Sequence, residues 1–360
     1  MLKKIRVFVV DDSIFFRQTL INDLKSRSNL EVVGFAASAL EARTKIPTLK
    51  PDVITMDVEM PGLSGIDFLK ELLPKYPIPV ILVSSLNLSV FDALHAGAVD
   101  FVQKPNMAKD YNVKSFFNVL NSKIFIASRA KVNVKPSQPG KPQTASSASA
   151  APVGGATAAF SSNLSQMVQN TMLIAIGAST GGTEATLEVL QRLPADMPGI
   201  VVTQHMPEGF TKMYAERLNR ICKLEVKEAE NGDRVRRGLV LIAPGGALQM
   251  RVEKDLKGFY VSCQPGEKVN GHRPSVDVLF SSVAKKAGKN AVGIIMTGMG
   301  RDGASGLLEM RKAGAFTIGQ DKESCVVYGM PMVAYEIGGV CTQASCTNIS
   351  NVLLNQLRKM

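Results

Sequence analysis

Short apolar runs alternate with amphipathic stretches through residues 1–124. Such runs are typical of buried strands, and apolar residues spaced three and four apart are typical of helices. The pattern predicts strands at Ile5–Val10, Glu31–Ala36, Asp52–Met56, Pro79–Ser84 and Val99–Phe101. It predicts helices near residues 14–26, 39–46, 65–73, 88–96 and 112–124. This alternation indicates an α/β domain in which helices cover both faces of a parallel sheet.

The same alternation returns over residues 171–360. The predicted strands are Leu173–Ile176, Ile200–Thr203, Glu225–Glu228, Leu239–Ile242, Val292–Met296 and Phe316–Gly319. Helices are predicted near residues 183–192, 208–220, 276–287 and 303–313, and a hairpin is predicted from Ala247–Val252 and Gly258–Cys263. The chain is therefore expected to contain two doubly wound, mainly parallel-sheet domains, the first flavodoxin-like and the second Rossmann-like.

Residues 125–170 interrupt this pattern. From Ser128 to Ala159 the chain is rich in Ala, Ser, Gly, Pro and Lys and has almost no large apolar side chain. Such a segment cannot bury a core, so it predicts a flexible linker between a domain at 1–124 and one at 171–360. A tether of this kind lets two domains dock and separate, and it also has the composition of a passive spacer.

Composition narrows the functional classes. The net charge is +11, but the sequence has no basic recognition helix, and this disfavours nucleic-acid binding. The second domain is mildly basic, which suits an acidic protein substrate. No apolar run is long enough to span a bilayer, and Asp11-Asp12 argue against a signal peptide. The five cysteines have no C-x-x-C spacing, as expected of reduced thiols in a cytoplasmic protein.

The strand ends of the first domain carry a consistent set of polar side chains. Ligands bind at the carboxyl ends of parallel strands, where this domain places Asp11, Asp12, Asp57, Ser84 and Lys104. Three carboxylates that meet at one edge repel each other unless a hard cation such as Mg²⁺ lies among them. A carboxylate beside that ion can accept a phosphoryl group, whose oxygens a hydroxyl and an ammonium can then bind.

This ordered set resembles the receiver domain of bacterial response regulators. The matching residues are Asp11-Asp12-Ser13, Asp57 within Met56-Asp57-Val58-Glu59-Met60-Pro61-Gly62, Ser84 and Lys104-Pro105. The resemblance implies Mg²⁺ bound by Asp11, Asp12 and Asp57, with Asp57 phosphorylated by a histidine kinase. Ser84 stands where many receivers carry threonine and keeps the hydroxyl group.

In the second domain, the stretch Ile174-Ala175-Ile176-Gly177-Ala178-Ser179-Thr180-Gly181-Gly182 indicates a strand, a tight turn and a helix. Ser179 on this turn fits the nucleophile pattern G-x-S-x-G. A serine needs a base, and imidazole needs a carboxylate to fix its tautomer. His205 follows the next strand and Asp302 follows a later one, so we assign Ser179 as nucleophile, His205 as general base and acid, and Asp302 as the orienting group.

The backbone amides of Thr180 and Met299 are candidate donors to an oxyanion at this site. The chain order rejects an α/β-hydrolase, because that fold places the acid between serine and histidine. His272 is the second choice for the base and could instead line the site. The duller alternatives are a phosphate-binding or purely structural turn, a structural His205, and Asp302 as a helix cap.

The second domain resembles the catalytic domain of the chemotaxis protein-glutamate methylesterases. The matching stretches are Ile176–Glu184, Val202–Pro207, Ala243–Gly246, Gly271–Asp277 and Met296–Ala304. The resemblance implies hydrolysis of glutamate methyl esters on cytoplasmic helices of chemoreceptors, with release of methanol, and deamidation of receptor glutamines. It also implies that the unphosphorylated receiver inhibits the enzyme and that the catalytic domain uses no cofactor.

Two hypotheses from other classes stay open at this point. The second domain could be a nucleotide-binding module that holds a phosphate at Gly177–Gly182, although no P-loop lysine follows and the spacing misses G-x-G-x-x-G. The protein could also be a response regulator that acts on DNA, although it lacks a helix-turn-helix pattern.

Overall fold

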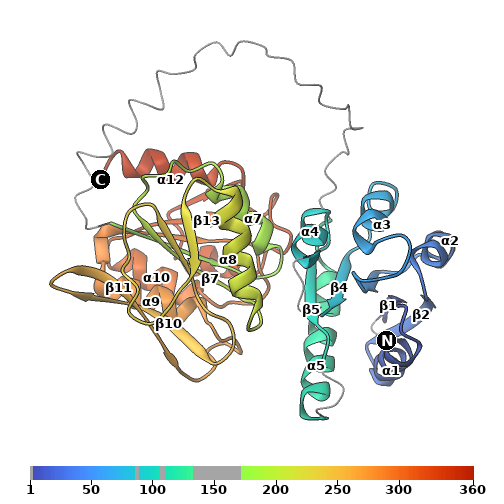
Figure 1. The fold of residues 1–360 in the computed structure, drawn as a ribbon. Coiled ribbons are helices and arrows are strands. Elements are labelled where there is room, and N and C mark those ends of the chain that lie inside the picture. Colours follow the sequence, from blue (N-terminus) through green and yellow to red (C-terminus); the bar gives the residue numbers. More distant parts are fainter. Residues whose placement is uncertain (1–2, 86–88, 106–109, 133–171) are drawn as a thin grey trace, which may run out of the picture. The chain divides into compact units, whose positions relative to one another are not determined.

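The computed structural model describes residues 3–85, 89–105, 110–132 and 172–360. The chain divides into two compact units, Met1–Ser137 and Gln138–Met360, and Figure 1 identifies their elements. The predicted linker 125–170 lies outside the described residues from 133 onward, and helix α5 extends to Ala127, beyond the predicted helix end at 124. Among the described helices, none combines the length and the apolar character needed to span a lipid bilayer.

The first unit has a five-stranded sheet in the order β2-β1-β3-β4-β5, with every pairing parallel. Its strands are β1 (Ile5–Val10), β2 (Leu30–Ala36), β3 (Val53–Met56), β4 (Val80–Ser84) and β5 (Asp100–Gln103). Its helices are α1 (Ile14–Ser26), α2 (Ala39–Leu49), α3 (Gly65–Leu72), α4 (Ser89–His95) and α5 (Asp110–Ala127).

Local sequence explains where the helices of the first unit begin. The hydroxyl groups of Ser13, Ser38 and Ser64 cap α1, α2 and α3 by accepting hydrogen bonds from backbone amides of the first turn. The order of strands changes direction between β1 and β3, so the residues that follow these two strands meet at one edge of the sheet.

The second unit has a seven-stranded parallel sheet and an antiparallel hairpin. Its strands are β6 (Leu173–Ala178), β7 (Gly199–Gln204), β8 (Glu225–Glu228), β9 (Leu239–Ile242), β10 (Leu248–Asp255), β11 (Gly258–Pro265), β12 (Ala291–Ile295), β13 (Phe316–Gln320) and β14 (Thr342–Ala344). Its helices are α7 (Gly182–Leu190), α8 (Phe210–Ile221), α9 (Val276–Lys286), the 3₁₀ turn η1 (Gly288–Asn290), α10 (Ala304–Lys312), α11 (Met330–Glu336) and α12 (Ile349–Leu357).

The strand order of this sheet is β14-β13-β12-β6-β7-β9-β8. The chain starts in the centre at β6, builds outward through β7, and later returns to the other side of β6 with β12. The carboxyl end of β6 is therefore the switch point, which is where ligands bind in open α/β sheets. Its immediate neighbours β7 and β12 place their own following residues beside it.

The hairpin β10–β11 belongs to the core of the second unit. Val252 and Val261 face each other across the hairpin and are fully buried in one apolar cluster with Phe280 of α9 and Leu307 of α10. The amide of Val252 also donates to the hydroxyl of Ser282 on α9 at 2.9 Å. This packing fixes α9, whose N-terminus helps to build the site described below.

The predicted fold class of two doubly wound, mainly parallel-sheet domains is confirmed. Four elements have no counterpart among the predicted ones: the 3₁₀ turn η1, α11, β14 and α12. Pro331 near the start of α11 indicates a turn in sequence, although proline also fits the first turn of a helix. Strand β14 is too short to show a period. Helix α12 did carry a signal in the spacing of Ile349, Leu353 and Leu357, which are all buried.

Candidate active site and carboxylate cluster

Three chemically reactive side chains meet at the switch point of the second sheet. Ser179 follows β6, His205 follows β7, and Asp302 lies in the loop between β12 and α10. Nδ1 of His205 lies 3.1 Å from Oγ of Ser179, and its Nε2 lies 2.8 Å from Oδ2 of Asp302. The structure thus brings together the three residues that the sequence assigned from their strand ends and motifs.

The orientation of the His205 ring defines the tautomer that this arrangement needs. An imidazole that is to take the serine proton at Nδ1 must carry its own hydrogen at Nε2. Asp302 accepts a hydrogen bond at that nitrogen, which favours this tautomer. The side chains of His205 and Asp302 are only 9% and 1% exposed, so water competes little for this hydrogen bond.

Asp302 lies against the N-terminus of α9, where backbone amides are free to donate. Its Oδ2 accepts from the amide of Val276 at 2.7 Å, and its Oδ1 accepts from the hydroxyl of Ser275 at 2.7 Å and from Nδ2 of Asn270 at 3.0 Å. Burial alone would raise the pKa of Asp302, but hydrogen bonds from His205, Asn270 and Ser275 hold it below its ordinary value. The orienting carboxylate is therefore ionised at neutral pH.

The carboxylate of Asp277 lies close to that of Asp302, and both accept a hydrogen bond from Asn270. Asp277 accepts from the amide of Gly306 at 2.7 Å and from Asn270 at 2.6 Å. Burial raises the pKa of Asp277 despite the hydrogen bond from Gly306, and the charge of Asp302 adds to the increase. The Asn270 amide thus lies between two carboxylates, which offsets part of their repulsion.

The turn that carries Ser179 is held from two sides. The Ser179 amide donates to the carbonyl of Thr297 at 3.0 Å, and the Ser179 carbonyl accepts from Gly182 at 2.7 Å. Gly298 has no room for a side chain, because a Cβ there would lie 2.6 Å from Cβ of Ser179. Gly181 has a φ of +76°, which lets the chain enter α7 directly after the serine.

The remaining predicted site residues lie in the segments next to the triad. Thr180 is buried and Met299 is half-buried, and their proposed role as oxyanion donors stays a prediction. The ring of His272 stacks on the ring of His205, with centroids 3.7 Å apart and planes 5° apart. This geometry places His272 against one face of the base, and it leaves the bond between His205 and Ser179 in place.

Sequence reasoning missed Gln204, Asn270 and Ser275, all of which contact the triad or its backbone. Ser275 had a signal, because it stands directly before a predicted helix and caps α9. Asn270-Gly271 indicated only a turn. Gln204 directly follows the predicted strand Ile200–Thr203, and nothing in the sequence indicated its contacts.

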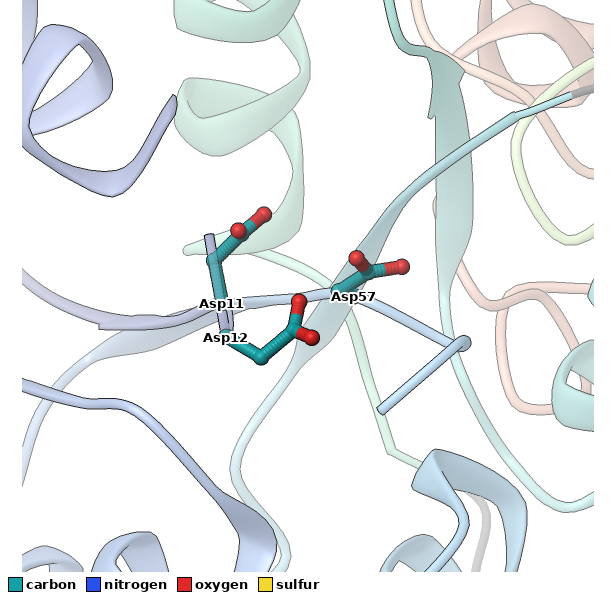
Figure 2. Close-up of side chains that lie close together, drawn as sticks. All are labelled: Asp11, Asp12 and Asp57. Atoms are coloured by element: carbon teal, nitrogen blue, oxygen red, sulfur yellow. The ribbon is translucent and has the colours of Figure 1, made fainter. Parts of the chain in front are cut away.

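A carboxylate cluster lies at the switch point of the first sheet. Ligand atoms of Asp11, Asp12 and Asp57 lie within 4.8 Å of one another, and Figure 2 shows these side chains gathered where β1 and β3 end. Nζ of Lys104 lies 2.5 Å from Asp57 and 2.9 Å from Asp11. Burial acts to lower the pKa of the Lys104 ammonium group. The hydrogen bonds and charges of Asp57 and Asp11 outweigh burial, so the pKa of Lys104 lies above its ordinary value.

The cluster contains a carboxylate whose pKa is raised and a buried hydroxyl group that makes no described hydrogen bond. Burial raises the pKa of Asp11, and the charge of Asp57 adds to the increase, although Lys104 acts in the opposite direction. Ser84 is fully buried between β3 and β5, and its hydroxyl oxygen has no hydrogen-bond partner among the described residues. A buried hydroxyl of this kind favours a ligand that supplies the missing hydrogen bond.

Comparisons with known proteins agree with both sites. The CheB methylesterase family matches residues 174–353, and the response regulator receiver domain matches residues 7–112. The chain is similar to a protein-glutamate methylesterase/protein-glutamine glutaminase of Syntrophomonas wolfei, with 52% identity and 99% of each chain covered. It is also similar to one of Escherichia coli K12, with 43% identity over 99% of this chain and 98% of that protein.

Among solved structures, the catalytic domain of the Thermotoga maritima CheB methylesterase matches with 36% identity and a TM-score of 0.51. The match covers 52% of this chain and 100% of that domain. These relatives favour the hydrolase interpretation over the nucleotide-binding and DNA-acting alternatives. The chain therefore belongs to the CheB family of protein-glutamate methylesterases/protein-glutamine glutaminases that carry a response regulator receiver domain.

Proposed function

We propose that this protein is a serine hydrolase of chemotactic adaptation that removes methyl groups from glutamate esters of chemoreceptors. It also deamidates receptor glutamines, because an ester and a primary amide form the same acyl group on a serine. The observation that carries the proposal is the hydrogen-bonded series Ser179–His205–Asp302 at the carboxyl ends of adjacent strands. Its substrates are receptor helices in the cytoplasm.

The geometry supports a two-step acyl transfer. The Ser179 oxygen attacks the ester carbonyl carbon while Nδ1 of His205 takes the hydroxyl proton, and Asp302 stabilises the imidazolium that forms. The tetrahedral intermediate collapses, His205 gives the proton to the departing methoxy group, and methanol leaves. Water then attacks the acyl-serine with His205 as base, which releases glutamate and restores the hydroxyl group.

The negative charge on the substrate oxygen needs nearby donors. We assign this role to the backbone amides of Thr180 and Met299. The Thr180 carbonyl accepts from the hydroxyl of Thr297 at 3.0 Å, which holds the turn in place at the start of α7. The positive end of the α7 dipole lies at the same point and favours an anion there.

The first unit supplies the regulatory input. We assign Asp57 as the residue that a chemotaxis histidine kinase phosphorylates, with Ser84 and Lys104 binding the added phosphoryl oxygens. Asp11, Asp12 and Asp57 would hold Mg²⁺, and their mutual distance and the raised pKa of Asp11 fit a site that accepts a further cation. Bound Mg²⁺ supplies charge neutralisation for the incoming phosphoryl group.

Phosphorylation of Asp57 is proposed to relieve an inhibition that the receiver domain (residues 1–124) exerts on the catalytic domain (171–360). A phosphoryl group adds close to two negative charges, and even a small change in the docking equilibrium of two domains alters the active fraction several-fold. The segment 125–170 is proposed to serve as the flexible connection that this exchange requires.

The test is methanol release from methylated receptor membranes, with ammonia release from glutamine-bearing receptors measured in parallel. Wild-type protein should release both products, and a small phosphodonor with Mg²⁺ should raise both rates. Ser179→Ala should release neither while it retains its far-ultraviolet circular dichroism spectrum. Ester hydrolysis by Ser179→Ala at the wild-type rate would contradict the proposed chemistry.

A further inference from the structure

Gln204 is buried at the point where the two reacting residues of the proposed active site approach each other. It is the last residue of β7 and pairs in register with Ala178, the last residue of β6. It is only 2% exposed. Gln204 therefore directly precedes His205, the base, and its partner across the sheet, Ala178, directly precedes Ser179, the nucleophile.

The Gln204 side chain hydrogen-bonds to the backbone of both. Nε2 of Gln204 donates to the Ser179 carbonyl oxygen at 2.9 Å and lies 3.4 Å from the His205 carbonyl oxygen. The first of these is an ordinary hydrogen bond and the second is a long one. One side-chain amide group thus connects the residue after β6 to the residue after β7.

The orientation of this amide follows from its surroundings. With the amide reversed, the Gln204 oxygen would face two carbonyl oxygens, and all three are acceptors. In the observed orientation Oε1 is buried without a hydrogen-bond partner among the described residues. It lies against Gly182, where a Cβ would be only 2.3 Å away. The Gln204 amide therefore makes its hydrogen bonds through Nε2, which donates to the backbone of Ser179 and His205, and not through its oxygen.

The serine turn is otherwise fixed mainly from the opposite side of β6. Its amide donates to the Thr297 carbonyl, and Thr297 follows β12. On the β7 side, the backbone of His205 donates to the Ala178 carbonyl at 3.2 Å, which fixes the base but not the serine peptide. The Ser179 carbonyl accepts from the Gly182 amide within the turn at 2.7 Å, and the Gln204 amide holds the same carbonyl from the side of the base.

We propose that Gln204 is a positioning residue that sets the separation between Oγ of Ser179 and Nδ1 of His205. This inference rests on the proposed function, because it deepens the account of the same site. Gln204 acts through the peptide groups of the two residues and contacts neither of their reacting atoms in the structure. Its loss should therefore lower kcat and leave KM nearly unchanged.

The test uses the full-length chain and two variants. Gln204→Glu keeps the shape and loses the donors when ionised, and Gln204→Met keeps the length without any polar group. We expect kcat for methanol release to fall about 10- to 100-fold in both, since small misplacements of reacting groups have effects of this size, with KM within about threefold of wild type. The rate at which a small fluorophosphonate modifies Ser179 should fall by the same factor, because that reaction needs no receptor docking.

Gln320→Met provides the matched control. Gln320 is also a buried glutamine, 1% exposed, at the end of the parallel strand β13, but it accepts from the Thr297 amide and donates to the Ser324 carbonyl, so it contacts neither Ser179 nor His205. Its variant should lose less kcat than either Gln204 variant at a similar loss of thermal stability.

Provided that wild-type protein releases methanol and reacts with the fluorophosphonate, either of two results would overturn the inference. One is a kcat within about threefold of wild type in whichever Gln204 variant folds. The other is an equal loss of kcat in the Gln320 control, which would indicate a general packing effect. A wild-type protein that fails in both assays would instead contradict the proposed function.

Discussion

Replacement of Asp302 by asparagine tests the orientation of the triad most sharply. The carboxylate presents Oδ1 to Asn270, Ser275 and the Asp277 amide, and Oδ2 to His205 and the Val276 amide. In Asp302→Asn the remaining oxygen should stay on the side with more donors. The new NH₂ group then faces Nε2 of His205, which must accept a hydrogen bond there. The ring hydrogen moves to Nδ1, the atom that should take the serine proton.

The size of the effect follows from these contacts. A hydrogen bond to a charged group contributes about 1.5–3 kcal/mol, and this contribution to the developing imidazolium is lost. The unsuitable tautomer adds a further barrier, because the base must first exchange its proton. Together they predict a fall in kcat of about 10⁴-fold, as expected when a triad acid is replaced by its amide. At about 1.36 kcal/mol for each factor of ten, this is about 5.4 kcal/mol.

The assay is the initial rate of methanol release at saturating methylated receptor. Asp277→Asn is the matched control, because Asp277 lies at the same helix N-terminus and shares Asn270 with Asp302, but its carboxylate accepts from Asn270 and Gly306 and not from His205. We expect the control to lose less than about tenfold. An Asp302→Asn protein that keeps more than about a tenth of the wild-type kcat would refute the assigned role of Asp302.

Four further predictions concern both units. Asp57→Asn should keep basal methanol release and lose stimulation by a phosphodonor, and stimulation that persists would place the phosphorylation elsewhere. His205→Ala should cost orders of magnitude in kcat and His272→Ala much less, since the ring of His272 stacks on the base and the base itself takes the serine proton; the opposite ranking would exchange their roles. A fragment starting near residue 165 should release methanol faster than the unphosphorylated full chain, and a slower fragment would argue against inhibition by the receiver. Because the folded-state pKa of Asp302 is depressed below about 3.9, its contribution to stability is present above that pH and is lost as the pH falls through the folded value. The difference in melting temperature between wild type and Asp302→Asn should therefore shrink on acidification below about pH 4, and a difference that grows would contradict the assigned ionisation.

The sequence was informative about the fold because both sheets are parallel. In a parallel sheet every strand delivers its following residue to the same edge, so Ser179, His205 and Asp302 could be grouped without knowledge of any contact. What the sequence did not contain was the strand order, and the structure shows that β12, β6 and β7 are direct neighbours. That adjacency converts three residues on one edge into a hydrogen-bonded series.

The residues that support the triad were harder to find for a physical reason. Asn270 lies in the loop between β11 and α9 with a φ of +52°, and from there it donates to Asp302, 32 residues later in the chain. Gln204 reaches Ser179 across the sheet from within a strand that is buried along its length. Such contacts depend on loop conformation and side-chain direction, neither of which follows from hydrophobic periodicity. His272 was found as a site-lining candidate, but its stacking on His205 was not foreseeable.

The most direct measurement is the location of the covalent adduct that a fluorophosphonate forms with the full-length protein. Peptide mass mapping of wild-type protein should find the added mass on Ser179, and replacement of His205 by alanine should slow its appearance by orders of magnitude. An adduct on another residue, or an unchanged rate of labelling without the imidazole, would contradict a serine nucleophile activated by His205.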